Sequence, residues 1–248
     1  MRHRPDGPVL VRTNPVTFLH PHTFARHEHD WDQLTYAASG VMRVETAAAS
    51  WIVPPHCAVW VPAGVAHAEQ MHAPVSVRTL YFAPRLAKTL PRECRTVSIP
   101  ALLRELILHV SRRGALDRRK RADAHLIGVL LDELASVSAV PLQLPLPHDP
   151  RALRFAAAVQ ARPADRSSIA ALGRRAGASR RTLERLFVAE TGMRVGDWRR
   201  RVRLLHAVRR LAESESVTNA ASESGYASVS AFVAAFRKTF GVTPGRYV

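Results

Sequence analysis

Residues 167–198 read SSIAALGRRAGASRRTLERLFVAETGMRVGDW, and a similar pattern returns in residues 217–247, VTNAASESGYASVSAFVAAFRKTFGVTPGRY. The matching positions are aromatic residues and glycines: Phe187, Gly192, Gly196 and Trp198 recur 49 residues later as Phe236, Gly241, Gly245 and Tyr247. A short unit repeated at this period is one supersecondary structure present twice. Two small helical units on one chain are typical of DNA-binding proteins, so the repeat predicts a domain with two DNA readers.

Each repeat has the pattern of a helix-turn-helix. In the first repeat, Ser167 or Ser168 can cap a helix, and the small Gly173 lets a second helix approach closely. Gly177 supplies the positive φ that ends the first helix, and Ser179 caps the next one. A plain helical hairpin is the alternative for one such motif, but two motifs in register favour DNA binding.

The second helix of each repeat is expected to enter the major groove. In the first repeat its outward positions are long or polar, whereas the second repeat offers one hydroxyl and several methyl groups there. We therefore expect the first unit to read bases and the second mainly to position the protein. The predicted DNA-binding residues are Ser179, Arg180, Arg181, Thr182, Glu184, Arg185, Val229, Ser230, Ala234, Arg237 and Lys238.

One helix over residues 195–212 is predicted to join the two units. Trp198, Val202, Leu205 and Val208 fall on one stripe of this helix, and several arginines lie elsewhere on it. A rigid connector would hold the readers one DNA turn apart, ~34 Å, on one face of the duplex.

The segment from residue 167 to residue 248 resembles the DNA-binding domain of the AraC/XylS family of bacterial transcription regulators. The signatures are 179–187, Glu190-Thr-Gly-Met193, Gly225-Tyr226, Ser230-Ala-Phe232, Phe236-Arg-Lys238 and Phe240-Gly-Val-Thr-Pro-Gly-Arg-Tyr247. The resemblance implies base contacts from Arg181, Glu184, Arg185, Val229, Ser230 and Ala234. Gly173 stands where the family usually has alanine, which predicts looser helix packing, and Ala234 replaces a residue that is often long and polar.

The charge of the chain agrees with a polyanionic partner. The net charge is +16, and residues 148–248 hold 19 basic and 8 acidic side chains. Double-stranded operator DNA is the expected partner, although charge alone would also suit a membrane surface. The sequence has neither a long apolar run nor a charged-then-apolar leader, so we expect a cytoplasmic protein that does not enter the membrane.

The sequence predicts an α+β protein with an N-terminal cupin-like β-barrel (jelly roll) and helical segment, followed by an all-α double helix-turn-helix. The predicted ranges are 1–97 for a sensor domain, 98–140 for a helical dimerisation segment, 141–148 for a proline-rich linker and 149–248 for the DNA-binding domain. Asp149 and Pro150 have the pattern of the cap and first residue of that domain's opening helix.

The barrel is predicted from short strand-like runs separated by Gly and Pro. Residues 34–38 and 41–46 are expected to pair as a hairpin around Gly40. A second resemblance, to the cupin motifs, rests on His27, His29, Gln33, Gly40 and, after Pro62-Ala-Gly64, His67. Gln33 replaces the motif's usual glutamate.

Residues 27, 29 and 33 share parity on a strand, and a barrel can bring His67 toward them. Three imidazoles and one amide oxygen would suit a divalent nickel, zinc or copper ion better than a hard ion. The alternative is a metal-free polar pocket for an organic effector. The sequence establishes no cofactor.

The helical segment can cover the barrel with one apolar face, and another face can either contact a second subunit, giving a homodimer, or pack within the chain. The function expected is a non-enzymatic, effector-responsive transcription regulator, which would also contact RNA polymerase if it activates. A metal-dependent cupin enzyme and a non-specific architectural DNA binder are the alternatives.

Overall fold

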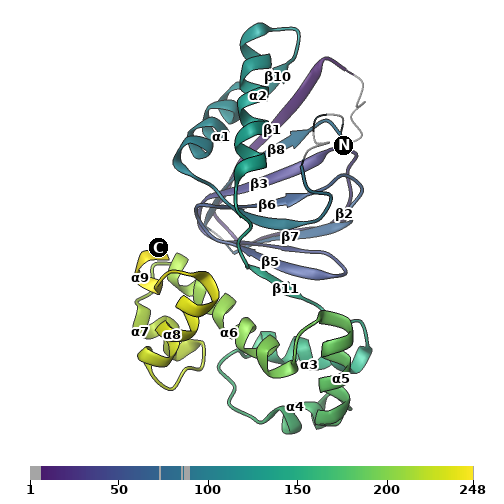
Figure 1. Ribbon diagram of the computed structural model, residues 1–248, viewed down its shortest axis with the longest axis vertical. Helices are drawn as coiled ribbons and strands as arrows, with labels where there is room; N and C mark the ends of the chain where they lie inside the picture. The colour runs from purple at the N-terminus through teal and green to yellow at the C-terminus, as the bar shows by residue number, and fades with distance from the viewer. Residues whose placement is uncertain (1–6, 73, 85, 87–89, 248) are drawn as a thin grey trace. The chain divides into compact units, whose positions relative to one another are not determined.

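The computed structural model describes residues 7–72, 74–84, 86 and 90–247. The outer limits of the predicted domains, Met1 and Val248, lie outside these residues. The chain divides into two compact units, Met1–Thr46 with Trp51–Leu142, and Ala47–Ser50 with Gln143–Val248 (Figure 1). The division after Leu142 falls inside the segment predicted as a linker.

The described strands form two sheets. The first has the order β10-β1-β8-β3-β6-β9 and contains β1 (Val9–Phe18), β3 (Asp32–Ser39), β6 (Cys57–Val61), β8 (Val75–Phe82), β9 (Arg95–Ser98) and β10 (Ala115–Asp117). The second has the order β11-β5-β4-β7-β2 and contains β2 (His22–His27), β4 (Met42–Glu45), β5 (Ala49–Val53), β7 (His67–Met71) and β11 (Gln143–Pro145).

The predicted hairpin around Gly40 is wrong. β3 pairs with β6 and β8, whereas β4 pairs with β7 in the other sheet. Gly40 has a φ of +72°, and a Cβ there would overlap the carbonyl oxygen of Pro74. The glycine therefore allows the chain to cross from one sheet to the other, which short-range pattern alone does not distinguish from a hairpin turn.

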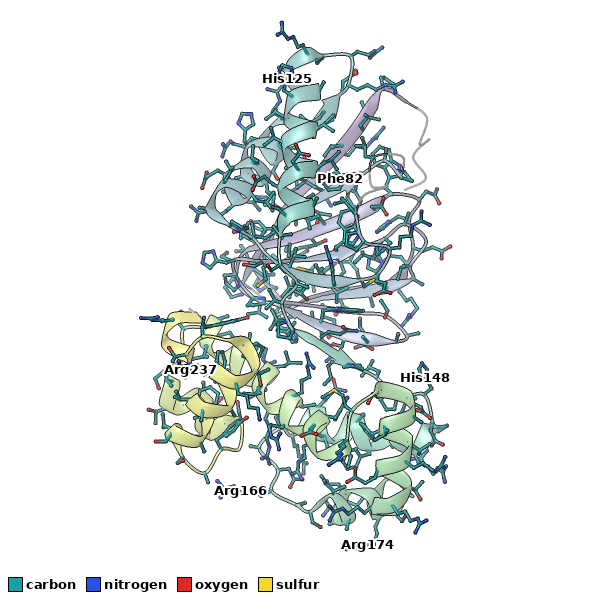
Figure 2. The ribbon with its side chains drawn as sticks, in the orientation of Figure 1. Phe82, His125, His148, Arg166, Arg174 and Arg237 are labelled. Carbon is teal, nitrogen blue, oxygen red and sulfur yellow. The ribbon has the colours of Figure 1, made fainter. Side chains whose placement is uncertain are left out.

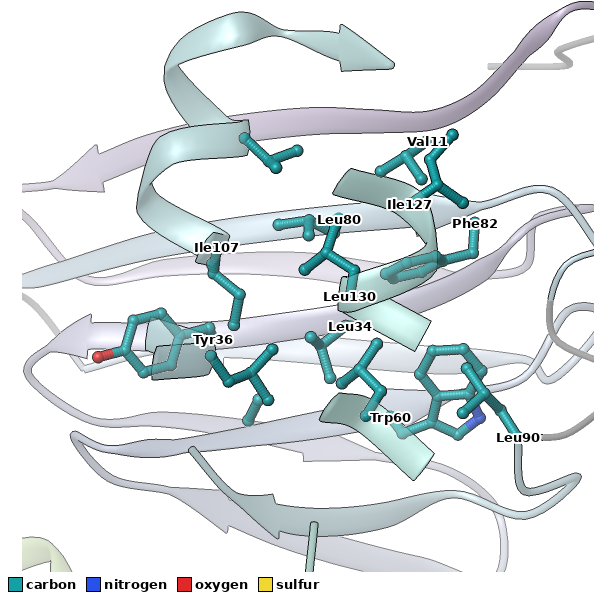
Figure 3. Packing of buried hydrophobic residues seen from close by; sticks show 14 of the residues in the cluster. Val11, Leu34, Tyr36, Trp60, Leu80, Phe82, Leu90, Ile107, Ile127 and Leu130 are labelled. Carbon is teal, nitrogen blue, oxygen red and sulfur yellow. The ribbon is translucent and has the colours of Figure 1, made fainter. Parts of the chain in front are cut away.

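Helices α1 (Ala101–Arg113) and α2 (Arg121–Ser136) cover one face of the first sheet (Figure 3). Leu34 and Tyr36 of β3 join Ile107 of α1 and Leu130 of α2 in this buried core. Because side chains alternate along a strand, the intervening residues of β3 face the other way. That opposite face carries the polar site described below.

The second unit is helical, which, with the sheets, confirms the predicted α+β class. Its helices are α3 (Pro150–Ala161), α4 (Ile169–Arg175), α5 (Arg180–Thr191), α6 (Val195–Ala212), α7 (Val217–Glu223), α8 (Val229–Phe240) and α9 (Pro244–Tyr247). Phe187 packs edge-on against Phe155 and Trp198, at ring distances of 5.6 and 5.1 Å. Phe236 occupies the corresponding place in the second repeat, against Phe232 and Tyr247.

Helices long and apolar enough to cross a membrane are absent from the described part of the chain.

Candidate nucleic-acid interface and candidate effector site

The first repeat forms a helix-turn-helix from α4 and α5. The Ser168 side chain caps α4, and the Ser179 side chain accepts from the Thr182 N–H at 3.1 Å to cap α5. Gly177 has the positive φ, +79°, expected at the turn. A Cβ on Gly173 would lie 2.8 Å from the Ala178 carbonyl oxygen, so this glycine permits a tight contact. The looser packing predicted for that position is wrong.

Helix α5 buries its predicted stripe, Leu183, Leu186 and Phe187. On the outer face Arg180, Arg181 and Arg185 are exposed, and Glu184 is half-buried. Arg180 lies 3.8 Å from Glu184, and the Ser179 and Thr182 hydroxyls hydrogen-bond to each other. Within the described residues, Arg181 and Arg185 have no hydrogen-bond or ion-pair partner. Their guanidinium groups are therefore free for an external ligand.

The second repeat forms the same motif from α7 and α8. Ser216 caps α7, Gly225 has a φ of +78°, and Ser228 caps α8. Phe232 and Phe236 are buried. Of the predicted DNA-binding residues, the exposed ones in this repeat are Val229, Ser230, Ala234, Arg237 and Lys238 (Figure 2, where Arg237 is labelled).

The connector is α6, with the predicted bounds, and its predicted stripe is buried. Its arginines are largely bound to the protein. Arg203 donates to the carbonyl oxygens of Pro163 and Asp165, at 3.1 and 3.0 Å. Arg210 pairs with Glu213, Glu215 and Glu223, which joins the end of α6 to α7.

The loop before the first reader contacts the turn of the second reader. A Cβ on Gly225, in the turn of the second reader, would lie 2.9 Å from the Cα of Ala164 in the loop before α4. Arg199 donates to the carbonyl oxygens of Ser167, at 2.7 Å, and Asp165 in the same loop. This loop is therefore held between α6 and the second turn, and the spacing of the readers is fixed by packing as well as by the connector.

In the first unit, the four residues predicted to form an effector or metal site lie close together. The ring of His67 lies 4.5 Å from that of His27 and 5.0 Å from that of His29, between ring centroids. His29 Nε2 lies 2.6 Å from Gln33 Oε1. His67 and Gln33 are buried, whereas His27 is exposed at the end of an edge strand.

Glu69 was missed by the sequence reasoning. It is buried, and its carboxylate accepts from the Gln33 amide at 2.6 Å, while the same amide donates to the Thr35 hydroxyl at 2.7 Å. Burial raises the pKa of Glu69 above its usual range. Its place two residues after His67 on one strand, and therefore on the same face, was the available signal.

The hydrogen bonds fix which imidazole nitrogens can accept. His67 Nδ1 donates to the Val65 carbonyl oxygen at 2.8 Å, which leaves Nε2 as an acceptor. With the Gln33 oxygen toward His29 Nε2, that nitrogen donates, and Nδ1 is the acceptor when the ring is neutral. Both acceptor nitrogens are buried and have no hydrogen-bond partner among the described residues. Burial lowers the pKa of His67 to about 4, so its ring is neutral at pH 7.

Within the described residues, no group of three His, Cys, Asp or Glu side chains is placed to hold a metal ion. The site offers the unpartnered ring nitrogens of His29 and His67 beside an amide and a buried carboxyl group, which suits a ligand that donates hydrogen bonds.

Known proteins resemble both units. Residues 172–248 match a helix-turn-helix domain model, and residues 19–135 match that of an AraC-like ligand binding domain. The HTH-type transcriptional regulator NimR of Escherichia coli K12 is 36% identical over 225 residues, which cover 90% of this chain and 81% of NimR.

Among solved structures, the DNA-binding domain of AdpA in complex with a target DNA is 33% identical, with a TM-score of 0.38, covering 40% of this chain and 90% of that one. Fatty acid-bound ToxT from Vibrio cholerae is 13% identical, with a TM-score of 0.40, covering 100% of this chain and 96% of ToxT.

Proposed function

The chain belongs to the AraC/XylS family of transcription regulators, and from this premise we propose that it reads a specific operator through α5 and answers to an organic effector in its barrel. The observation that carries the first part is the pair of exposed, unpartnered guanidinium groups of Arg181 and Arg185 in the early turns of α5. Arginine in this position can bind guanine through two hydrogen bonds.

The second reader supports binding in a different way. Val229, Ser230 and Ala234 can contact thymine methyl groups or phosphates but make few hydrogen bonds to bases. Arg237 and Lys238 are exposed in the last turn of α8 and supply charge for the backbone. We therefore assign sequence reading mainly to α5 and positioning mainly to α8.

The effector we propose is an uncharged or weakly charged organic molecule with N–H or O–H donors. The unpartnered acceptor nitrogens of His29 and His67 support this class of ligand, because a buried acceptor without a partner costs about 1–3 kcal/mol until a donor reaches it. His27 and Gln33 complete the proposed site.

We place a dimer contact on the outer faces of α1 and α2. Leu102 and Val129 expose 56% and 42% of their surface there, although both are apolar. Burying such side chains against a second copy would be favourable. The oligomeric state follows from the mass of the protein in solution, measured for the wild type and for Leu102→Asp.

The regulator is tested by selecting sites from a random duplex library and comparing the selected site with random DNA at fixed salt. Sequence-specific binding should exceed random binding by about 10³-fold or more. Equal affinity for both would identify a non-specific architectural protein and overturn the proposal. An effector of the proposed class should change operator affinity in the full chain, and His67→Ala should abolish that change.

A further inference from the structure

A cavity of about 250 Å³ lies between the two readers, and the function proposed so far does not use it. It is lined by Ile169, Gly196, Arg199, Arg200, Arg203 and Tyr226. Ile169 begins α4 of the first reader, α6 supplies the glycine and arginines, and Tyr226 lies in the turn of the second reader. In Figure 1 α6 runs between α3–α5 and the pair α7 and α8.

The cavity is strongly cationic. Arg199 and Arg203 donate only to backbone carbonyl oxygens, and no carboxylate in the described residues forms an ion pair with either. Burial and the charge of Arg203 hold the pKa of Arg199 below its usual value. Arg200 pairs with Asp197 at 2.9 Å, but both side chains are about half exposed, so the pair is readily opened.

Tyr226 adds a donor without a partner. Its hydroxyl oxygen is buried and makes no hydrogen bond within the described residues. The charges of Arg203 and Arg200 act on this phenol, which places it beside the cationic groups. A buried hydroxyl normally has a hydrogen-bond partner, so the Tyr226 hydroxyl is a donor that a group bound in the cavity could satisfy.

The position of the cavity indicates what that group is. In a helix-turn-helix the first helix crosses the DNA backbone and the second begins in the major groove. Ile169 starts such a first helix, and Tyr226 lies two residues before the cap of the second recognition helix. A duplex that offers successive major grooves to α5 and α8 must carry its backbone past the segment between them.

We propose that the cavity binds a backbone phosphate of the operator, with Tyr226 donating its hydroxyl proton in a hydrogen bond and Arg200 supplying the charge. Arg199 and Arg203 add positive potential while they hold the loop before α4. This inference rests on the proposed DNA binding and adds a site that reads no bases. The cavity should therefore contribute equally to the affinity for cognate and random DNA, whereas Arg181 should contribute mainly to the affinity for cognate DNA.

The test uses the full chain with Tyr226→Phe and Arg200→Gln, which leave the loop clamps intact. Tyr226→Phe should weaken binding to both DNAs about 3- to 10-fold while leaving the thermal midpoint of the free protein unchanged or higher, because an unpartnered hydroxyl is removed. Arg200→Gln should reduce the slope of log affinity against log salt by about 0.9. Arg118→Gln, an exposed charge in the loop between β10 and α2, is the matched control and should change neither quantity.

The outcomes separate this site from the regulator itself. Wild-type affinity and salt slope in both variants, with Arg181→Ala defective, would overturn the phosphate site and leave the regulator standing. A wild type that binds no DNA would overturn the regulator. Calorimetry with inorganic phosphate is the remaining measurement. Tight binding lost in Tyr226→Phe, with DNA binding unchanged, would assign the cavity to a small phosphorylated ligand and overturn the backbone contact.

Discussion

Gln33 donates its amide to the buried carboxylate of Glu69 at 2.6 Å, while its oxygen faces His29 at the same distance. The amide of Gln33 thus bridges the carboxylate of Glu69 and the imidazole of His29. A glutamate in place of Gln33 would bring two carboxylates together. We predict that Gln33→Glu is destabilising at pH 7. One of the two carboxyl groups must then stay protonated.

In Gln33→Glu, the pKa of the carboxyl group that must stay protonated is raised in the folded state. The folded protein is therefore least destabilised below the unfolded pKa of this group, and it loses stability as the pH rises through the folded pKa. Denaturant unfolding of Gln33→Glu should therefore show less destabilisation at pH 5 than at pH 8. Gln33→Met is the control without a charge. A pH-independent loss would show that packing, not ionisation, is responsible.

Acid should destabilise the barrel through His67. Its folded pKa of about 4 lies below the unfolded value, so the neutral ring stabilises the fold above pH 6.5 and this contribution is lost as pH falls toward 4. The loss by pH 5 is on the order of 2 kcal/mol. His67→Gln should remove this part of the pH dependence when unfolding is measured at pH 7.5 and pH 5. His206→Gln, in the other unit, is a control that should not alter barrel unfolding.

Replacing Arg181 or Arg185 with alanine should cost about 1–3 kcal/mol at the cognate site and relax specificity for the base contacted. The measurement is binding to the selected operator and to each single-base variant. If affinity falls equally on cognate and random DNA, these arginines contact only the backbone.

Gly173→Ala restores the residue usual at this position in the family, yet it should destabilise the second unit. The new Cβ would lie 2.8 Å from the Ala178 carbonyl oxygen, a backbone atom that cannot move away alone. The strain should exceed the gain in helix propensity of about 1 kcal/mol. Gly128→Ala on α2, where nothing lies within 4 Å, is the matched control and should stabilise its own unit. A higher melting temperature for Gly173→Ala would contradict the tight contact.

A fragment beginning at Gln143 should fold and bind DNA, with lower affinity than the full chain if dimerisation contributes. A fragment beginning at Asp149 should be less stable by about 1 kcal/mol, because the indole N–H of Trp198 donates to the Pro145 carbonyl oxygen at 2.7 Å. Thermal unfolding of both fragments compares them. Equal stability would favour the boundary predicted at residue 149.

The repeated motif made the second unit predictable almost residue by residue. Caps at Ser168 and Ser179, positive φ at Gly177 and the bounds of α6 all follow from local chemistry, and the structure confirms them. The barrel was harder, because which strands pair depends on contacts between distant residues. Glu69 illustrates the difference, since only the pairing of β7 within the barrel brings it to Gln33.

The clamp on the loop before α4 limits how the operators of this protein can vary. Because Ala164 packs against Gly225, the two readers are held at a fixed distance from each other. One base pair inserted between their targets turns the second target by about 35° around the duplex axis, beyond the reach of a helix held in place. We therefore expect base substitutions in an operator to change its occupancy in small steps, and insertions or deletions between the two targets to abolish recognition. Operators should then vary in base sequence but keep their length.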